Sequence, residues 1–284
     1  MTHRIIHSIA VAIDCSPHSK ASLEAAAEMA VRLKAELIGI FVEDIDLLHM
    51  AGLPFAEEIR LYSATTGKLD TAQLERLLRV QAQQASEMLR LSAESRTLQH
   101  TFRVLRGMVP EQLMLAAPEA DMLVLGRSGR SPSCRKGLGS TARTALHECK
   151  MDVMLMRPGV TAAEGPLLVL CDGSEASKRA LRTALEIAGP KSTLNLLVTD
   201  PAPDAVERCK EETDAILNGR AIEAEYYHLP FTDARQLASF IRMIDSGLLV
   251  IGEGMNLPAE TLRELIDNID YPVLMVRGGV NYEL

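Results

Sequence analysis

The chain has 284 residues, of which 47% are hydrophobic and 24% charged, and its formal net charge is −8. This length favours two domains over one. An acidic chain lacks the basic face that nucleic-acid binding requires, and an aromatic content of 4%, without tryptophan, provides no platform for stacking bases. No apolar run approaches the roughly 18 residues of a membrane span. We therefore expect a protein that engages neither nucleic acid nor membrane.

The N-terminal segment and the cysteines bear on location. A short apolar patch follows Arg4, but Asp14 comes soon after it and no small-residue cleavage site appears. We interpret the patch as a first strand rather than as a signal peptide. The five cysteines are scattered, odd in number and without CxxC spacing, which is typical of a reducing compartment. We expect the protein to be cytoplasmic.

The second part of the chain repeats the pattern of the first. Both copies begin with an apolar run that ends in Asp-x-Ser, at residues 9–16 and 167–174. Each run leads into a segment of helical periodicity and then into another apolar run, and the later apolar runs match as well. The sequence therefore predicts two tandem domains, residues 1–158 and 165–279, joined by a short linker.

Short apolar runs that alternate with helix-period stretches indicate βαβ units in a parallel sheet covered by helices on both faces. The elements expected in the first copy are, in chain order, a strand near 5–13, a helix near 19–34, a strand near 37–42, a helix near 70–95, a strand near 100–105, a helix near 110–117, a strand near 121–125, a helix near 140–149 and a strand near 152–156. The second copy is more compact. Most of the difference is an insertion from Asp44 to Asp70, either a surface excursion with one short helix or a lid over a ligand site.

A glycine-rich loop follows the strand near 121–125. Gly126 and Gly129 stand at the strand end, where glycine lets the backbone turn sharply and approach a ligand. Gly139 and Ser140 open the next helix, and helix N-termini bind phosphate through their free N–H groups. The sequence therefore predicts an anion site in an acidic chain.

Side chains of the same segment add possible phosphate donors. Ser128 and Ser140 carry hydroxyl groups, and Thr141 offers a backbone N–H in the first helical turn. Residues 126–143 include no acidic residue. Five basic residues, each a phosphate contact or a solvated surface group, lie in the loop and the first helical turn: Arg127, Arg130, Arg135, Lys136 and Arg143.

Ligands of open parallel sheets bind beyond the carboxyl ends of the strands. Asp14, Val42 and Gly126 each stand at such an end, so we expect them to share one pocket. The Asp14 carboxylate could accept hydrogen bonds from an adenine amino group or a ribose hydroxyl, or it could cap the following helix, a role also open to Ser16 and Ser19. Val42 could offer its backbone to an adenine edge, or be an ordinary core residue.

Other constellations are weaker. His147-Glu148-Cys149 has metal-ligating residue types, but three consecutive helical residues cannot converge on one ion, so no metal site is predicted. Gly139 lacks the following Lys of a Walker A motif. No Ser/His/Asp arrangement indicates a nucleophile, so no catalytic residue is predicted. Cys134 is either a redox thiol activated by nearby cations or an incidental loop residue.

The spacing G-x2-G-x9-G-S, at Gly126, Gly129 and Gly139-Ser140, resembles the ATP-binding signature of the universal stress proteins. Because the agreement extends over both copies, the chain resembles a tandem bacterial member of that family. The resemblance implies an adenine-nucleotide alpha-hydrolase-like α/β fold: two tandem open parallel five-stranded sheets, strand order 3-2-1-4-5, with helices on both faces. Family members pair through their last strands, so residues 153–156 and 273–276 are expected to pair as an intrachain pseudo-dimer.

The resemblance also implies a function, namely a stress-response protein that binds ATP in its first domain and acts as a nucleotide-dependent regulator or scaffold. Whether Mg²⁺ accompanies ATP, whether two chains associate as a homodimer, and which protein partner reads the bound state stay open. Two alternatives remain: a weak ATPase or phosphotransferase, and a scaffold that binds no nucleotide or takes a small apolar ligand. The implied ATP contacts are Asp14 and Val42 for adenine and ribose, and Gly126, Gly129, Gly139, Ser140 and Thr141 for phosphate, with Ser128 as a further donor.

The second copy departs from the signature. Gly252 is followed by Glu253, and Pro258 stands where Gly-Ser should open the helix. Glu260 and Glu264 add negative charge in the region where phosphates would lie. We expect residues 165–279 to bind no ATP tightly and to serve a structural role or take a different ligand.

Overall fold

The computed structural model describes residues 6–53, 57–60, 65–68, 70–129, 137–159, 165–189, 192–217, 222–230, 233–244, 247–269 and 271–278. The first half contains, in chain order, β1 (Ser8–Ala12), α1 (Pro17–Leu33), β2 (Glu36–Asp44), α2 (Ile45–Ala51), β3 (Glu57–Arg60), β4 (Thr65–Lys68), α3 (Thr71–Glu94), β5 (His100–Gly107), α4 (Val109–Ala116), a 3₁₀ helix (Ala117–Glu119), β6 (Met122–Gly126), α5 (Ser140–Glu148) and β7 (Asp152–Met156). The expected order of strands and helices is confirmed. β2 continues past Val42 because it stays paired with β5 as far as Asp44.

The second half repeats this order without the insertion. It contains β8 (Leu167–Cys171), α6 (Glu175–Ile187), β9 (Leu194–Val198), α7 (Ala205–Leu217), β10 (Ala224–His228), α8 (Ala234–Ile241), β11 (Leu248–Gly252), α9 (Ala259–Asn268) and β12 (Val273–Val276). Within the described part of the chain, no helix is both long and apolar enough to cross a membrane.

The main sheet is continuous across the two halves. Its ten strands follow the order β10-β9-β8-β11-β12-β7-β6-β1-β2-β5. Each half thus contributes five strands that, counted along the chain, run 3-2-1-4-5, as the resemblance implied. The pairs within each half are parallel, whereas β7 and β12 pair antiparallel, with Met154 opposite Leu274. The expected pairing of the last strands is present, so the two predicted sheets form one.

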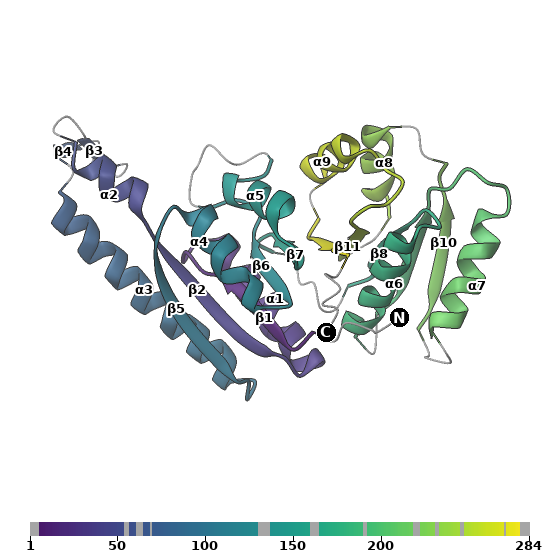
Figure 1. The fold of residues 1–284 in the computed structure, drawn as a ribbon, viewed down its shortest axis with the longest axis horizontal. Helices are drawn as coiled ribbons and strands as arrows, with labels where there is room; N and C mark the ends of the chain where they lie inside the picture. The colour runs from purple at the N-terminus through teal and green to yellow at the C-terminus, as the bar shows by residue number, and fades with distance from the viewer. Residues whose placement is uncertain are drawn as a thin grey trace, which may run out of the picture.

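Each face of the sheet carries one apolar core cluster that extends through both halves. Helices α1, α3, α6 and α7 supply one cluster, and α4, α5, α8 and α9 supply the other (Figure 1). Side chains of β6 alternate between them: Met122 and Val124 belong to the first cluster, and Leu123 and Leu125 to the second. Because helices cover both faces of the sheet, the side chains on both faces of β6 are apolar. A continuous apolar run is the sequence pattern that predicts a strand buried on both faces.

Arginines also join the halves outside the sheet. Arg277, after β12, donates to the carbonyl oxygen of Leu146 near the end of α5 at 2.5 Å. Arg32 of α1 donates to the carbonyl oxygen of Ile187, the last residue of α6, at 2.9 Å. A cation at a helix C-terminus satisfies unpaired carbonyl groups and complements the negative end of the helix dipole. These contacts hold helices of one half against the other.

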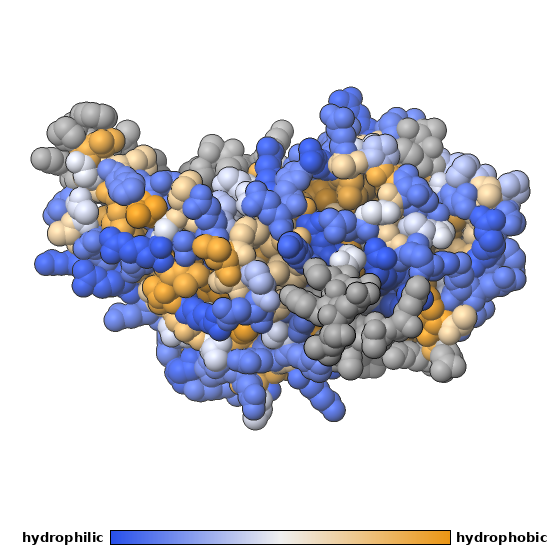
Figure 2. All heavy atoms as spheres, in the orientation of Figure 1, coloured by the Kyte–Doolittle hydropathy of each residue, from blue (hydrophilic) through white to orange (hydrophobic). Residues whose placement is uncertain are grey.

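The insertion forms an outlying structure. Helix α2 packs against α3 and β5, and β3 and β4 form an antiparallel hairpin. Figure 1 places α2 and the hairpin at the end of the molecule farthest from the second half. Apolar side chains of this segment, such as Leu47 and Met50, are exposed, and orange atoms gather in this region of Figure 2. The short helix agrees with the surface-excursion interpretation, while residues 54–56, 61–64 and 69 lie outside the described residues.

Candidate functional site

The turn after β1 positions the first predicted residue. The Asp14 Oδ1 accepts a hydrogen bond from the Ser16 N–H at 2.9 Å, which closes a tight turn before α1. The Ser16 hydroxyl then accepts from the Ser19 N–H at 3.1 Å and caps the helix. The cap is therefore Ser16 rather than Asp14, and the alternative role considered for Asp14 is wrong.

Gly126, the last residue of β6, faces the first turn of α1. A Cβ at this position would lie 2.7 Å from the Cβ of His18, which is closer than two carbon atoms can approach. The missing side chain lets the strand end against the helix. Packing therefore requires a glycine here whether or not a ligand binds, in addition to the ligand approach predicted from the sequence.

The glycine loop closes back on the strand end. The Gly139 N–H donates to the carbonyl oxygen of Arg127 at 2.8 Å, and a Cβ on Gly139 would lie 3.4 Å from the Ser128 Cα. A Cβ on Gly129 would lie 3.6 Å from the Asp14 Oδ2. The fold thus gathers Asp14, Ser128, Gly129 and Gly139 from two distant segments, as the sequence predicts. Residues 130–136, in the middle of the loop, lie outside the described residues.

Helix α5 begins where the loop ends. Gly139 is its N-cap residue and has no side chain that could accept a hydrogen bond from the first turn. Ser140 and Thr141 are the first two helical residues; Ser140 is exposed and Thr141 partly buried. N-terminal amides without a side-chain cap suit an anionic acceptor from outside the helix. The phosphate-donor role of Ser140 and Thr141 stays a prediction.

Val42 presents its backbone beyond the end of β1. The last β2 residue paired with β1 is Ile40, whose carbonyl oxygen accepts the Ile13 N–H at 2.9 Å. Successive residues of a parallel strand direct their backbone groups to opposite neighbours, so the N–H and C=O of Val42 point to the same side as those of Ile40. On that side β1 has already ended. The Val42 side chain is partly buried against the core cluster of α4 and α5.

Two of the five basic residues lie close to α9 of the second half. Arg127 is buried, and its guanidinium donates to the carbonyl oxygen of Ile266 in α9, in the second half of the chain, at 2.6 Å. Arg143 lies 3.9 Å from the Asp267 carboxylate of the same helix. The phosphate role considered for Arg127 is wrong, because its guanidinium binds a carbonyl oxygen near the C-terminal end of α9 instead. The other three, Arg130, Arg135 and Lys136, lie outside the described residues.

His18 is a site residue that sequence reasoning missed. Its Nε2 lies 3.0 Å from the Ser128 Oγ, and its buried Nδ1 has no hydrogen-bond partner in the described structure. The position follows the Asp-x-Ser turn and forms part of the first turn of α1, but helical periodicity does not show which loop a side chain will meet. At the equivalent position the second copy has Ala176. This difference between the copies was the signal that could have identified His18.

The second half repeats the turn but uses its groups differently. The Asp172 Oδ1 accepts from the Ser174 N–H at 3.0 Å, as Asp14 does from Ser16, but the Asp172 Oδ2 also accepts from the Asn256 N–H at 2.5 Å. The loop after β11 is thus folded onto this carboxylate. By strand register Thr199 is the counterpart of Val42, and its N–H donates to the Cys171 carbonyl oxygen at 2.8 Å.

The start of α9 also differs from that of α5. Its N-cap residue is Pro258, which caps no amide, and Glu260 stands in the first turn. The Glu253 carboxylate forms an ion pair with the buried Arg277. Glu264 pairs with Arg235 at 3.2 Å. The negative charges expected to repel phosphate are therefore present, and two of them hold local structure.

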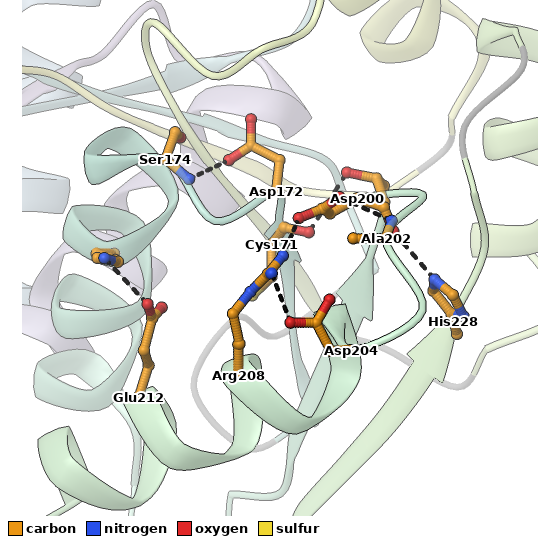
Figure 3. Close-up of polar contacts among 11 residues, drawn as sticks. Cys171, Asp172, Ser174, Asp200, Ala202, Asp204, Arg208, Glu212 and His228 are labelled. Carbon is orange, nitrogen blue, oxygen red and sulfur yellow. Dashed lines mark hydrogen bonds and ion pairs between the residues drawn. The ribbon is translucent and has the colours of Figure 1, made fainter.

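A cavity of about 220 Å³ lies at the carboxyl ends of β8 and β9, between α6 and α7. Charged side chains along it are paired: Lys178 lies 3.0 Å from Glu212, and Arg208 lies 2.7 Å from Asp200. Figure 3 shows the polar contacts along this edge, with Cys171 among them. The apolar part of the lining includes Leu181 and Val198 together with Cys171 and Cys209.

The strand order and the helices on both faces define an α/β protein of the adenine nucleotide alpha-hydrolase-like fold. Among similar solved structures, a universal stress protein from Archaeoglobus fulgidus DSM 4304 is 16% identical, with 96% of each chain covered and a TM-score of 0.70. A putative universal stress protein from Pseudomonas aeruginosa UCBPP-PA14 is 15% identical, covers 96% of this chain and 93% of its own, and has a TM-score of 0.58. At these identities the likeness establishes the fold.

The sequence itself identifies the family. Residues 6–157, just over half of the chain, match the model of the universal stress protein family. No curated protein sequence matches the chain. The protein belongs to the universal stress protein family.

Proposed function

We propose that this universal stress protein binds one ATP at the glycine loop of its first half and acts as a nucleotide-dependent regulator or scaffold in a stress response. The observation that carries the proposal is the closure of the loop: Gly139 is hydrogen-bonded to Arg127, and Gly129 stands beside the Asp14 carboxylate. This arrangement puts a carboxylate for ribose or adenine within reach of an uncapped helix N-terminus for phosphate.

The two ends of ATP call for different partners, and the first half offers both kinds. The backbone of Val42 points past the end of β1, where an adenine edge could pair with it. Gly126, Gly129 and Gly139 keep the loop close to the strand end, and Ser140 and Thr141 begin α5. Within the described residues no cluster of His, Cys, Asp and Glu suited to a metal ion is present, so any Mg²⁺ would depend mainly on the phosphate oxygens.

Titration calorimetry of the full chain with ATP, with and without Mg²⁺, tests the proposal. We expect one ATP per chain, and at least an approximately tenfold loss of affinity, about 1.4 kcal/mol, in Gly139→Val and in Ser140→Ala. Ala259→Ser, at the matching first position of α9, is the control and should leave affinity and stoichiometry unchanged. No ATP binding by the unmodified chain, or an affinity that both first-half variants share with the unmodified chain, would contradict the proposal.

A second function, phosphoryl transfer to Ser128, is favoured by the His18–Ser128 contact of 3.0 Å. In the tautomer protonated at Nδ1, the His18 Nε2 can accept the hydroxyl proton while the Ser128 oxygen attacks the terminal phosphorus of ATP and ADP leaves. Phosphopeptide mapping after incubation with MgATP should find phosphoserine at 128, reduced in His18→Gln. Unmodified Ser128 in a protein shown to bind ATP would eliminate this function and leave the binding proposal intact.

We also propose a cytoplasmic location. The described cysteines, Cys15, Cys149, Cys171 and Cys209, are free thiols, which suits a reducing compartment.

A further inference from the structure

Two cysteines line the cavity between α6 and α7. Cys171 is the last residue of β8, and Cys209 lies in α7. They are 38 positions apart in the chain, yet both side chains line the same cavity, and their thiols are close enough to interact electrostatically. Both residues are buried, and both belong to the core cluster on that face of the sheet. The fold has therefore placed two thiols close together.

The cavity gives small polar molecules a route to this pair. Its volume of about 220 Å³ compares with about 30 Å³ for one water molecule, so water and hydrogen peroxide both fit. The polar lining includes Asp172, Lys178, Arg208 and Glu212, and Figure 3 shows Cys171 beside Asp172 and Arg208. An oxidant of this size can therefore enter the cavity that both cysteines line.

We propose that Cys171 and Cys209 form a peroxide-responsive thiol pair that closes into a disulfide. The reaction has two steps. The Cys209 thiolate attacks one oxygen of hydrogen peroxide, the O–O bond breaks, and the products are a sulfenic acid on Cys209 and, after proton uptake, one water molecule. The Cys171 sulfur then attacks the sulfenic sulfur, the S–O bond breaks, and a second water molecule leaves as the S–S bond forms. Two thiols are oxidised and one peroxide is reduced.

The electrostatics assign the roles of the two sulfur atoms. The interaction with Cys171 lowers the pKa of the Cys209 thiol against the opposing effect of burial. The pKa of Cys171 is raised, because its thiol interacts with Cys209 and is deeply buried. Nearby cations contribute little, since Lys178 is neutralised by Glu175 and Glu212, and Arg208 by Asp200 and Asp204. Cys209 is therefore the attacking thiol and Cys171 the resolving thiol.

The disulfide would change the second half without involving the first. It would tie the end of β8 to α7 across the cavity and so restrain both of its walls. The first half has Ile13 where the second has Cys171, and its partly buried thiol, Cys15, contacts the carbonyl oxygen of Gln81 instead. The proposal does not depend on ATP binding.

Mass spectrometry of the oxidised full chain tests the pair. In a Cys134→Ser background, one to two equivalents of hydrogen peroxide at neutral pH should remove two free thiols and produce a peptide cross-linked between 171 and 209. Reduction with dithiothreitol should reverse the change. Cys15 and Cys149 are internal controls: Cys149 contacts the Met114 sulfur at 3.4 Å, and burial raises its pKa to about 11, so it should stay reduced.

Variants separate the two roles. Cys171→Ser should accumulate sulfenic acid on Cys209, trapped by dimedone, whereas Cys209→Ser should show neither sulfenic acid nor a cross-link at Cys171. Cys171→Ala and Cys209→Ala, checked by circular dichroism, distinguish lost chemistry from lost folding. The proposal is overturned if both thiols survive the peroxide dose in the folded protein, if the cross-link appears only in denaturant, or if either cysteine pairs with a different residue.

Discussion

The carboxyl edges of the two halves share the turn and the helix cap after their first strand, and they differ in the loop after their fourth strand. Asp14 and Asp172 close the same turn, and Ser16 and Ser174 cap the following helices through matching hydrogen bonds. The loops after the strand-ending glycines differ: one closes on Gly139, and the other folds an amide onto Asp172. The turn and the helix cap thus serve folding in both halves, whereas ligand binding depends on the loop after the fourth strand.

Gly126 and Gly252 show that a shared glycine need not signal a shared ligand. A Cβ on Gly252 would lie 2.5 Å from the carbonyl carbon of Ala176, and a Cβ on Gly126 would lie 2.7 Å from the His18 Cβ. Both glycines let a strand end against a helix. The phosphate hypothesis therefore rests on the later glycines, Gly129 and Gly139, which have no equivalent packing clash.

The largest expected effect comes from the glycines that the halves share. Gly252→Ala forces a methyl group into helix backbone, so we expect a loss on the order of 3 kcal/mol in the free energy of unfolding. Gly126→Ala meets a side-chain carbon instead and should cost less. Urea unfolding of both variants measures this difference. Equal and small losses would mean that the strand–helix contact is looser than described.

The aspartates should separate stability from ligand binding. Asp172→Asn turns an amide group toward the Asn256 N–H, and we expect it to lose about 2 kcal/mol of stability, since charge-assisted hydrogen bonds contribute about 1.5–3 kcal/mol. Asp14→Asn should cost less stability but weaken ATP binding at least about tenfold, equivalent to 1.4 kcal/mol. Thermal unfolding and calorimetry on both proteins provide the comparison. A reversed pattern would exchange the roles of the halves.

A third difference concerns the ends of α5 and α9, where Cys149 and Ile269 occupy matching C-cap positions. Burial raises the pKa of Cys149 from 9.0 to about 11. Because the folded value is the higher one, the associated stability is complete below pH 9 and declines as the pH rises toward 11. We expect the unmodified chain to lose about 2 kcal/mol more than Cys149→Val over this range. Parallel stability curves for the two proteins would refute the assignment.

The smallest expected effect involves the residue after each aspartate. Cys15 has a φ of 61° and its counterpart Gly173 a φ of 76°, so both adopt the left-handed conformation that favours glycine. We expect Cys15→Gly to stabilise the protein by about 0.5 kcal/mol and Gly173→Ala to destabilise it by about 1 kcal/mol. Denaturant midpoints of the two variants should move in opposite directions. Movement in the same direction would show that side-chain contacts outweigh backbone strain.

Much of the fold could be predicted from the sequence, because the patterns that indicate strands and helices are local. Apolar runs and helical periodicity predict the strands and helices, and the echo of Asp-x-Ser predicts the two copies. The gathering of Asp14 with the glycine loop follows from a general property of parallel sheets. The extension of β2 to Asp44 could not be predicted from the sequence. It depends on pairing with β5, which lies more than 50 residues further along the chain.

By itself the sequence determined the element order, the two-copy plan and the residues at the carboxyl edge of the first half, since each depends on burial or turn chemistry within a few neighbouring positions. Only the tertiary structure decided which side chains those residues meet. It turned Arg127 away from the loop and toward α9, set His18 against Ser128, and brought Cys171 to Cys209. Such contacts depend on the path of the whole chain, and no local period encodes them.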